Sequence, residues 1–115
     1  MPVHTPHSIL VPVKDMSTSV SFFRETMGLK LKIQDGTRYA AFELGSLTLA
    51  LVADAERVVD EPALSFRVSD IAAAVAGARE AGAQIVLAVA QGPHEKRAVL
   101  REPGGTALVF SEKTG

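Results

Sequence analysis

The chain has 115 residues, 47% of them hydrophobic and 22% charged, and its formal net charge is −1, values typical of one globular domain with a hydrophobic core. The small net charge argues against nucleic acid or an anionic membrane as a partner, and the absence of cysteine excludes a disulfide framework, a thiolate metal site and a cysteine nucleophile. We expect a single cytoplasmic domain over residues 1–115, without a signal peptide or a membrane-spanning segment.

The first part of the chain predicts a strand followed by a helix. Residues 1–6 are expected to be a loosely held arm, and alternating apolar side chains predict a strand over 8–13. Asp15 is a good helix N-cap, and Gly28 is expected to end the helix. Between them a stripe of apolar residues recurs at helical spacing and predicts the buried face of the helix. The stripe consists of Met16, Val20, Phe23 and Met27.

Three strands are expected after this helix, over residues 29–34, 38–44 and 47–53. Asp35-Gly36 is the strongest hairpin signal in the sequence, since both residue types tolerate positive φ, and Gly45-Ser46 suits a second tight turn. In the first of these strands the apolar residues alternate and are expected to share one face. They are Leu29, Leu31 and Ile33. Residues 7–53 are therefore expected to form a first βαβββ module.

The second module, residues 63–111, follows an acidic linker over 54–62, which is expected to be solvated, and repeats the first. Its helix is capped by Asp70, which stands 55 positions after Asp15, and ends at Gly82. Alternating apolar residues predict a first strand from residue 63, and further strands are expected over the ranges 83–90, 97–101 and 107–111, with a frayed tail from residue 112. Two such modules predict an α+β fold with a mixed sheet around a cavity.

Several short motifs in matching order resemble a known family. The first module carries Asp15-Met16, Ser19, Phe22-Phe23 and Met27-Gly28-Leu29. The second carries Asp70-Ile71, an Ala-rich helix and Gly82, and a Pro-Gly turn follows near the C-terminus, in the sequence Glu102-Pro103-Gly104-Gly105-Thr106. The ordered set resembles the vicinal oxygen chelate superfamily, which includes glyoxalases, extradiol dioxygenases and bleomycin-resistance proteins. The resemblance implies paired βαβββ modules that curl around a cavity, often with two chains per functional unit.

The resemblance also implies four metal-ligand positions, two from each module. In this chain they are occupied by Ser8, Leu49, Ala63 and Val109. Three of these side chains offer no donor atom, and a Ser hydroxyl is a poor substitute for imidazole or carboxylate. We therefore expect no metal, no cofactor and no catalytic residue of the family's usual kind. A shift of the alignment by one residue places His7 in the first position. At the other three positions the same shift brings in no side chain that is better suited to bind a metal.

Five polar residues outside these positions have two interpretations each. The three imidazoles, His4, His7 and His94, are either stray surface residues or part of a non-standard site. Glu43 shares a strand face with Tyr39 and Ala41 and points either outward or toward a ligand. Arg67 is either a cavity cation for an anionic or carbonyl ligand or a partner of a linker carboxylate.

Strand alternation predicts a cavity with apolar walls and a few polar groups, as in many small-molecule sites; the alternative is that the same side chains fill a core. The predicted lining is Ser8, Leu10, Leu47, Leu49, Leu51, Ala63, Ser65, Arg67, Ala107 and Val109. The favoured function is metal-independent binding of an unidentified small organic molecule, such as an antibiotic or hydrophobic metabolite, by a homodimer. The alternatives are a lyase or dioxygenase whose displaced metal site uses His4, His7 or Glu43, and a structural or regulatory dimer without a ligand.

Overall fold

The computed structural model describes residues 4–114, which fall into two compact units. The α1 unit, Ser8–Pro62, contains helix α1 (Met16–Ser21). The α2 unit contains helix α2 (Ile71–Glu80) and comprises the described residues up to His7 and those from Ala63 onward. The units follow the predicted module boundary, except that the N-terminal strand contributes its first described residues to the α2 unit. That the two units form one domain stays a prediction.

The N-terminal strand β1 (His4–Pro12) is longer than expected. The expectation that residues 1–6 form a loose arm is wrong for residues 4–6, which belong to this strand, while residues 1–3 lie outside the described part of the chain. Within the α2 unit the ring of His4 lies edge-on to Phe110, with 5.1 Å between the ring centroids. This aromatic contact gives the start of the strand a packing partner that local sequence does not reveal.

The sheet of the α1 unit is mixed. The Ser8–Pro12 part of β1 is parallel to β4, and the other neighbouring strands are antiparallel. The strands follow the order β2 (Leu31–Asp35), β3 (Tyr39–Leu44), β4 (Leu47–Val52), β1. The two predicted turns, at Gly36 and Gly45, are confirmed, and both glycines have positive φ. After β4 the linker begins with a short 3₁₀ turn, Asp54–Glu56.

Helix α1 begins as predicted but ends in a π-helical segment, Phe22–Thr26. The Asp15 carboxylate accepts a hydrogen bond from the Thr18 N–H at 3.3 Å and caps the helix. At the other end the Met27 N–H donates to the carbonyl of Phe22, five residues earlier. This wider turn contains an extra residue, so the side chain of Met27 rotates away from the core. Met27 is 54% exposed, and its predicted place in the buried stripe is wrong.

A β-bulge changes the orientation of the second half of β2. Leu31 pairs with Phe42, whereas Ile33 pairs with the adjacent Ala41, so Lys32 is an extra residue on this strand. One extra residue moves all later side chains to the opposite face. Ile33 consequently does not share a face with Leu31, as the alternation predicted, and it is 58% exposed.

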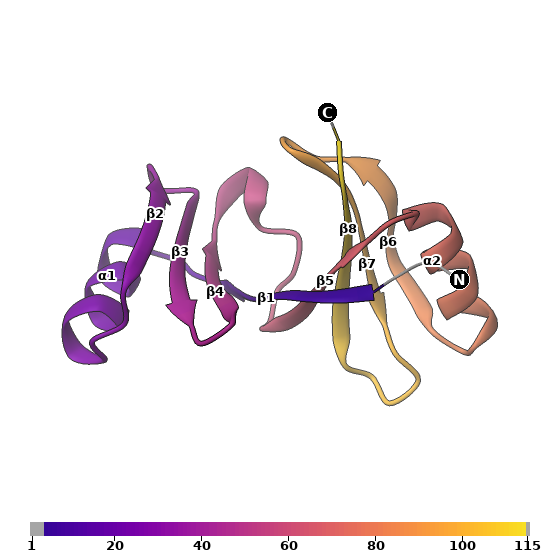
Figure 1. Ribbon diagram of the computed structural model, residues 1–115, viewed down its shortest axis with the longest axis horizontal. Helices are drawn as coiled ribbons and strands as arrows, with labels where there is room; N and C mark the ends of the chain where they lie inside the picture. Colours follow the sequence, from indigo (N-terminus) through magenta and orange to yellow (C-terminus); the bar gives the residue numbers. More distant parts are fainter. Residues whose placement is uncertain (1–3, 115) are drawn as a thin grey trace. The chain divides into compact units, whose positions relative to one another are not determined.

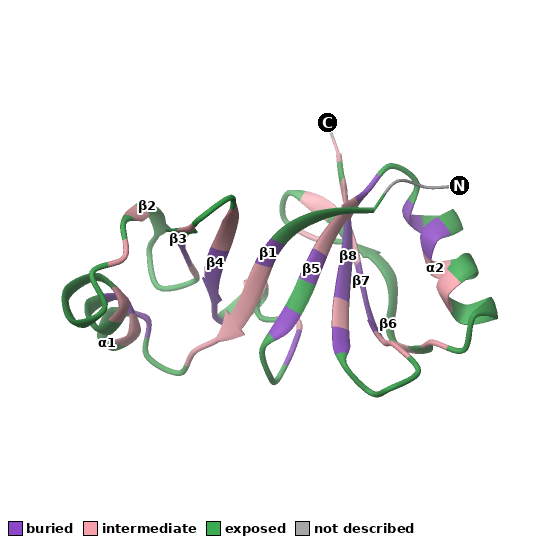
Figure 2. Ribbon diagram, turned by 60° about the horizontal axis from the view of Figure 1, so that its bottom comes forward, coloured by how far each residue is buried: buried purple, intermediate pink, exposed green. Residues whose placement is uncertain are grey.

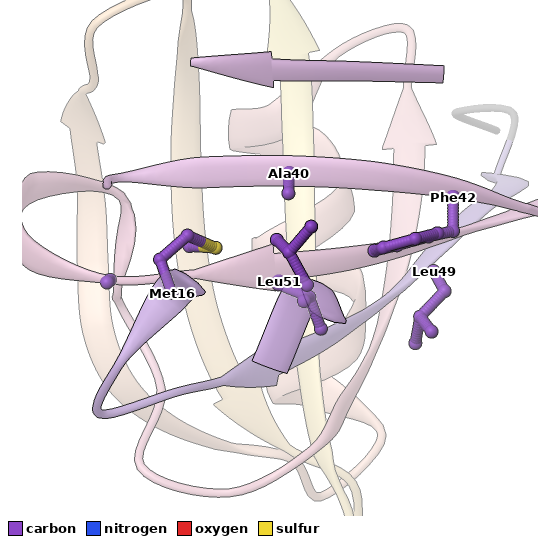
Figure 3. Packing of buried hydrophobic residues seen from close by; sticks show 7 residues of the cluster. Met16, Ala40, Phe42, Leu49 and Leu51 are labelled. Atoms are coloured by element: carbon purple, nitrogen blue, oxygen red, sulfur yellow. The ribbon is translucent and has the colours of Figure 1, made fainter. Parts of the chain in front are cut away.

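The core of the α1 unit lies between its helix and one face of its sheet (Figure 3). Met16 of the helix contacts a cluster that includes Phe42 of β3 and Leu51 of β4, and the last two are fully buried. Phe23 packs against the edge of this cluster, with its ring 6.0 Å from that of Phe42. The predicted apolar stripe of α1 therefore packs on the core as far as Phe23. This residue already lies in the π-helical segment.

The α2 unit repeats this arrangement with a second mixed sheet. Strand β5 (Ala63–Val68) is parallel to β8 (Ala107–Lys113), which is antiparallel to β7 (Glu95–Arg101), and β6 (Gln84–Gln91) forms the edge. The last two strands are longer than predicted because Glu95 pairs with Lys113 and Lys96 with Glu112. Fraying from residue 112 is therefore wrong for residues 112 and 113, and Gly115 lies outside the described residues. Strand β6 is exposed along most of its length, whereas β8 is largely buried (Figure 2).

Helix α2 is capped by two carboxylates from different parts of the chain. The predicted N-cap, Asp70, accepts from the Ala73 N–H at 3.1 Å, and Glu112 of β8 accepts from the Ile71 N–H at 2.8 Å. The helix packs on the sheet through the buried side chains of Ile71 and Ala74, and it lies beside β6 (Figure 1). The predicted α+β class with two βαβββ modules is confirmed. No helix within residues 4–114 is long and apolar enough to cross a membrane.

Two glycine-to-alanine substitutions are expected to change stability in opposite directions. Gly28 has a φ of +72°, so Gly28→Ala forces an L-residue into the left-handed region and lowers the free energy of unfolding by about 1–2 kcal/mol. Gly77 lies inside α2, and a Cβ atom added there would meet no neighbouring element within 4 Å, so Gly77→Ala raises that free energy by about 0.5–1 kcal/mol. Urea unfolding of both variants tests the pair, and effects of the same sign contradict the helix boundaries described above.

The turn before β8 predicts a dependence of stability on pH. Backbone N–H groups of Thr106 and Gly104 donate to the Glu102 carboxylate at 3.0 and 2.7 Å, and they hold the pKa of this carboxyl below its usual value. A lowered pKa stabilises the fold above the unfolded-state pKa of about 4.3, and this contribution is lost as the pH falls through the folded-state value. Glu102→Gln should therefore lower the melting temperature at pH 7, and its difference from wild type should shrink towards pH 3. Glu25→Gln, outside this turn, is the control, and a difference that persists at pH 3 contradicts the assignment.

Candidate functional site

In each unit the helix covers one face of the sheet, and the candidate site residues were predicted on the other. In the α2 unit, Phe66 and Phe110 pack with the helix. Their neighbours along the strands consequently lie on the opposite face, which we call the α2-distal face. It carries all the candidate residues predicted from this module, namely Ala63, Ser65, Arg67, Ala107 and Val109. That they line a ligand cavity stays a prediction.

Most of the α2-distal face is buried. Ser65 and Val109 are paired across β5 and β8, and they are 5% and 3% exposed. Val99 of β7 pairs with Val109 on its other side and is also buried. In this row a hydroxyl adjoins two apolar side chains, a composition that fits both a small-molecule site and the filled core given above as its alternative.

A second row on this face contains two residues that the sequence analysis missed. Arg67 pairs with Ser111 of β8, and Ser111 pairs with Arg97 of β7. Residues paired directly across neighbouring strands project on the same side of the sheet. The position of Ser111 follows from extending the Ala107–Val109 alternation by two residues, but that of Arg97 requires the pairing register, which the sequence does not specify.

The contact of Arg67 described by the structure is to an imidazole. Its Nη2 atom lies 3.4 Å from the Nε2 atom of His7, which belongs to the same unit. A guanidinium is always protonated and has no acceptor, so it is the donor in this contact. This contact orients the side chain of Arg67 without supplying a negative charge to it. His4 and His7 are both exposed, and so is His94, in the turn between β6 and β7.

The side chain of Arg97 lies against the turn between β6 and β7. A Cβ atom added at Gly92 would be 2.9 Å from its Nε atom and 3.0 Å from the Glu95 carbonyl oxygen. Glycine at this position therefore leaves room for the guanidinium beside the backbone. The nearest carboxylate along the same face of β7 is that of Glu95, whose cross-strand partner is Lys113.

In the α1 unit the register corrects part of the predicted lining. Ser8 pairs with Thr48, and Leu10 pairs with Ala50, so these four side chains share the face opposite α1. Leu49 instead belongs to the core beneath the helix (Figure 3). By the same alternation Leu47 and Leu51 lie on the helix side, and Leu51 is fully buried in that core. Their predicted place beside Ser8 is wrong, because the sequence gives the period of β4 but not its register against β1.

Glu43 lies in the polar row next to Ser8. It pairs with Thr48, and its carboxylate lies 3.8 Å from the Lys30 ammonium group, with 49% of its own side chain exposed. The Lys32 Nζ atom donates to the Thr48 hydroxyl at 2.6 Å. Its position in β3 places Glu43 on the same face as Tyr39 and Ala41, as the alternation implied. An exposed carboxylate beside lysines is typical of a solvated surface rather than of a metal site.

A depression lies between the helix and the edge strand of the α2 unit. It is an open groove of about 650 Å³ between α2 and β6. Its lining is apolar apart from Arg79 and Gln84, because α2 presents small side chains there. The lining residues are Ala72, Val75, Ala76, Arg79, Ala83, Gln84, Ile85, Ala88 and Val89.

Comparison with known proteins identifies the family. Residues 5–110 match the model of the Glyoxalase/Bleomycin resistance protein/Dioxygenase superfamily. The chain belongs to this superfamily. A relative described as an uncharacterized protein of Mycolicibacterium smegmatis is 29% identical over 108 residues, which cover 93% of this chain and 92% of the relative.

Two solved structures show the same fold as this superfamily member. One, described as an NAD-dependent benzaldehyde dehydrogenase from Legionella pneumophila, has a TM-score of 0.80 at 20% identity and covers 95% of this chain and 100% of its own. The other, a glyoxalase/bleomycin resistance protein/dioxygenase superfamily member from Vibrio splendidus 12B01, has a TM-score of 0.70 at 18% identity, with coverages of 98% and 100%. At such identities the similarity extends to the fold alone.

The metal implied by the superfamily does not fit the residues at the expected positions. Ser8 and Ala63 supply one hydroxyl and one methyl group from the two first strands. Of the other two, Leu49 lies in the core under α1 and Val109 is apolar. Divalent transition metals are held by imidazole, carboxylate or thiolate donors, which this set lacks. Residues 4–114 contain no group of three or more His, Cys, Asp or Glu side chains arranged to hold a metal ion.

Because Leu49 is buried and Met27 is exposed, replacing each by alanine is expected to lower the free energy of unfolding by different amounts. Leu49→Ala removes a buried side chain from the α1 core and should lower the free energy of unfolding by about 2–5 kcal/mol. Met27→Ala is the matched control, because this side chain is 54% exposed and its loss should change stability by at most about 0.5 kcal/mol. Chemical denaturation measures both. Equal costs would contradict the assignment of the two residues to core and surface.

Proposed function

We propose that this superfamily member binds a small organic molecule, such as an antibiotic or a hydrophobic metabolite, without a metal ion. The α2-distal face supports this function. Ser65 and Ser111 are buried polar residues beside the buried side chains of Val99 and Val109, and Arg67 is half-buried in the next row. Apolar surface with a few fixed polar groups is the usual composition of a small-molecule site.

The side chains at the positions of the implied metal ligands support binding without a metal. Ser8, Ala63 and Val109 provide a single hydroxyl at the positions where the resemblance implies ligands. In contrast, hydroxyl and guanidinium groups recognise carbonyl and anionic groups directly through hydrogen bonds. The proposed role is therefore sequestration of the ligand. The homodimer and the cytoplasmic location expected from the sequence stay predictions.

Binding to metal-stripped protein tests this function. The protein is dialysed against EDTA and then titrated, by calorimetry, with a panel of antibiotics, hydrophobic carboxylic acids and their neutral amides. Native mass spectrometry of the freshly purified protein searches in parallel for a co-purified molecule. We expect saturable binding of one organic molecule per chain, and we expect its affinity to be unchanged when Zn²⁺, Ni²⁺ or Mn²⁺ is added.

Two results would contradict the proposal. A stoichiometric transition metal in the purified protein, with ligand binding or turnover that stops after EDTA treatment, would favour an enzyme with a displaced metal site. A complete absence of binding across the panel, together with no co-purified molecule, would favour the structural or regulatory role.

A further inference from the structure

The groove between α2 and β6, which we call the α2–β6 groove, has a cation at one end and apolar walls along the rest (Figure 1). Its helical wall is formed by Ala72, Val75, Ala76 and Arg79, and its strand wall lies within residues 83–89. We infer that this groove is a binding site for an alkyl carboxylate whose head group pairs with Arg79. The site lies on the helix side of the sheet, away from the α2-distal face, and does not depend on the function proposed above.

The connection between helix and strand determines which end of the groove is charged. Arg79 lies in the last turn of α2, and a short turn leads from there into β6, so the cation lies at the end where the two elements are joined. Residues 72 and 79 are seven positions apart on one stripe of the helix, which spans about 10 Å along the axis. Beyond Arg79 the lining consists of alanine, valine and isoleucine. An amphipathic ligand therefore fits in one direction, with its head group at Arg79.

The guanidinium of Arg79 is available to a ligand. Within residues 4–114 it forms no hydrogen bond or ion pair, and the residue is exposed. The described lining contains no carboxylate, and Glu80 lies about 100° further around the helix. Gln84 pairs with Arg101, which pairs with Ala107 on the α2-distal face, so the side chain of Gln84 begins on that face. A single cation without a carboxylate partner favours a head group with one negative charge.

The negative end of the helix dipole opposes an anion at this position, but its carbonyl groups are partnered. The carbonyls of Gly77, Ala78 and Arg79 accept hydrogen bonds from the N–H groups of residues 81–83. The partial charge at a helix end is carried by its unsatisfied groups and amounts to about half an elementary charge. The full charge of the Arg79 guanidinium exceeds it, so the charged end of the groove attracts an anion.

The volume and the walls of the groove suit a hydrocarbon chain. Its volume of about 650 Å³ lies within the range of about 300–1,000 Å³ that is usual for small-molecule sites. Val89 is 38% exposed, and Ala72, Ala76 and Ala88 are exposed as well, so a bound chain removes apolar surface from water. Because the groove is open, one side of the ligand stays in water, and we expect a dissociation constant in the millimolar range.

The experiment compares octanoate, whose extended chain is about as long as the helical stripe, with its neutral amide. ¹⁵N-labelled protein is titrated with octanoate and, separately, with octanamide, and amide chemical shifts are followed by NMR. We expect saturable shifts centred on residues 72–79 and 83–89 with both probes. Octanamide should bind about fivefold more weakly, which corresponds to about 1 kcal/mol, because an exposed ion pair contributes no more than about this amount.

One pair of variants tests the charge. Arg79→Met keeps much of the apolar stem of the side chain and removes its charge, so it should weaken octanoate binding about fivefold and leave octanamide binding unchanged. Arg24→Met is the matched control, because Arg24 is an exposed residue that stands 55 positions earlier, at the equivalent place in the first module. It should bind both probes like the wild type.

A second pair of variants tests the groove. Ala76→Leu places a larger side chain in the lining, where it takes the space of the ligand chain, and should abolish the saturable shifts of both probes. Ala73→Leu makes the same change on α2 outside the lining and should alter neither. Leucine is a good helix former, and the dispersion of the amide spectrum verifies that each variant is folded.

The outcomes separate this site from the proposed function. Equal affinities for the two probes, or unchanged octanoate binding in Arg79→Met, overturn the pairing of a carboxylate with Arg79. Shifts centred on residues 65–67, 97–99 and 109–111, or unchanged binding in Ala76→Leu, overturn the location and leave binding at the α2-distal face in place.

Two further results would also overturn the site. If the shifts of residues 72–79 and 83–89 depend on protein concentration without a probe, and sedimentation shows a dimer that Ala76→Leu abolishes, the groove is occupied by a second copy of the chain. Absence of octanoate binding at tens of millimolar excludes the alkyl carboxylate, whereas the proposed function fails only if its broader panel and native mass spectrometry are also negative.

Discussion

The constraint on which this structure depends is the pairing register of strands that are each covered by a helix on one side. Because side chains alternate along a strand, burying Phe66 and Phe110 beneath α2 places Arg67 and Ser111 on the other face. The same constraint in the α1 unit places Leu49 in the core and Thr48 beside Ser8. Which residues lie on the face opposite each helix is therefore decided by where the helix packs and by how adjacent strands are aligned.

The two modules satisfy this constraint with different side chains. The α1 unit uses large residues, with Met16 and Phe23 reaching into the sheet, and its helix widens into a π turn where the bulky stripe ends. The α2 unit uses Ala74 and other small residues, so its helix runs regularly for ten residues close to the sheet. Both modules keep the pattern of strand, Asp cap and helix, whereas the packing of each helix depends on its own side chains.

Membership of the superfamily gives the fold, whereas the chemistry depends on which residues lie on the sheet faces opposite the helices. Where the resemblance implied metal ligands, this chain has a serine, an alanine and apolar residues. It has instead a row of Arg67, Ser111 and Arg97 beside buried valines. At these positions the shared fold therefore carries side chains whose chemistry differs from that of metal ligands.

The sequence by itself determined the two βαβββ modules, the Asp15 and Asp70 caps and the positions of the turns, because these depend on local preferences and on the periods of helices and strands. It also predicted that Ala63, Ser65 and Arg67 share a face. It did not predict the bulge in β2, the π turn before Met27 or the neighbours of β4 and β8, so Ile33, Met27 and Leu49 were misplaced and Arg97 was missed. The π turn is a local change of helical hydrogen bonding, from Met27 to Phe22, for which the sequence gave no signal. The bulge and the strand neighbours follow from pairing between strands, and only the tertiary structure decides them, since a shift of one residue in register exchanges the two faces of a strand.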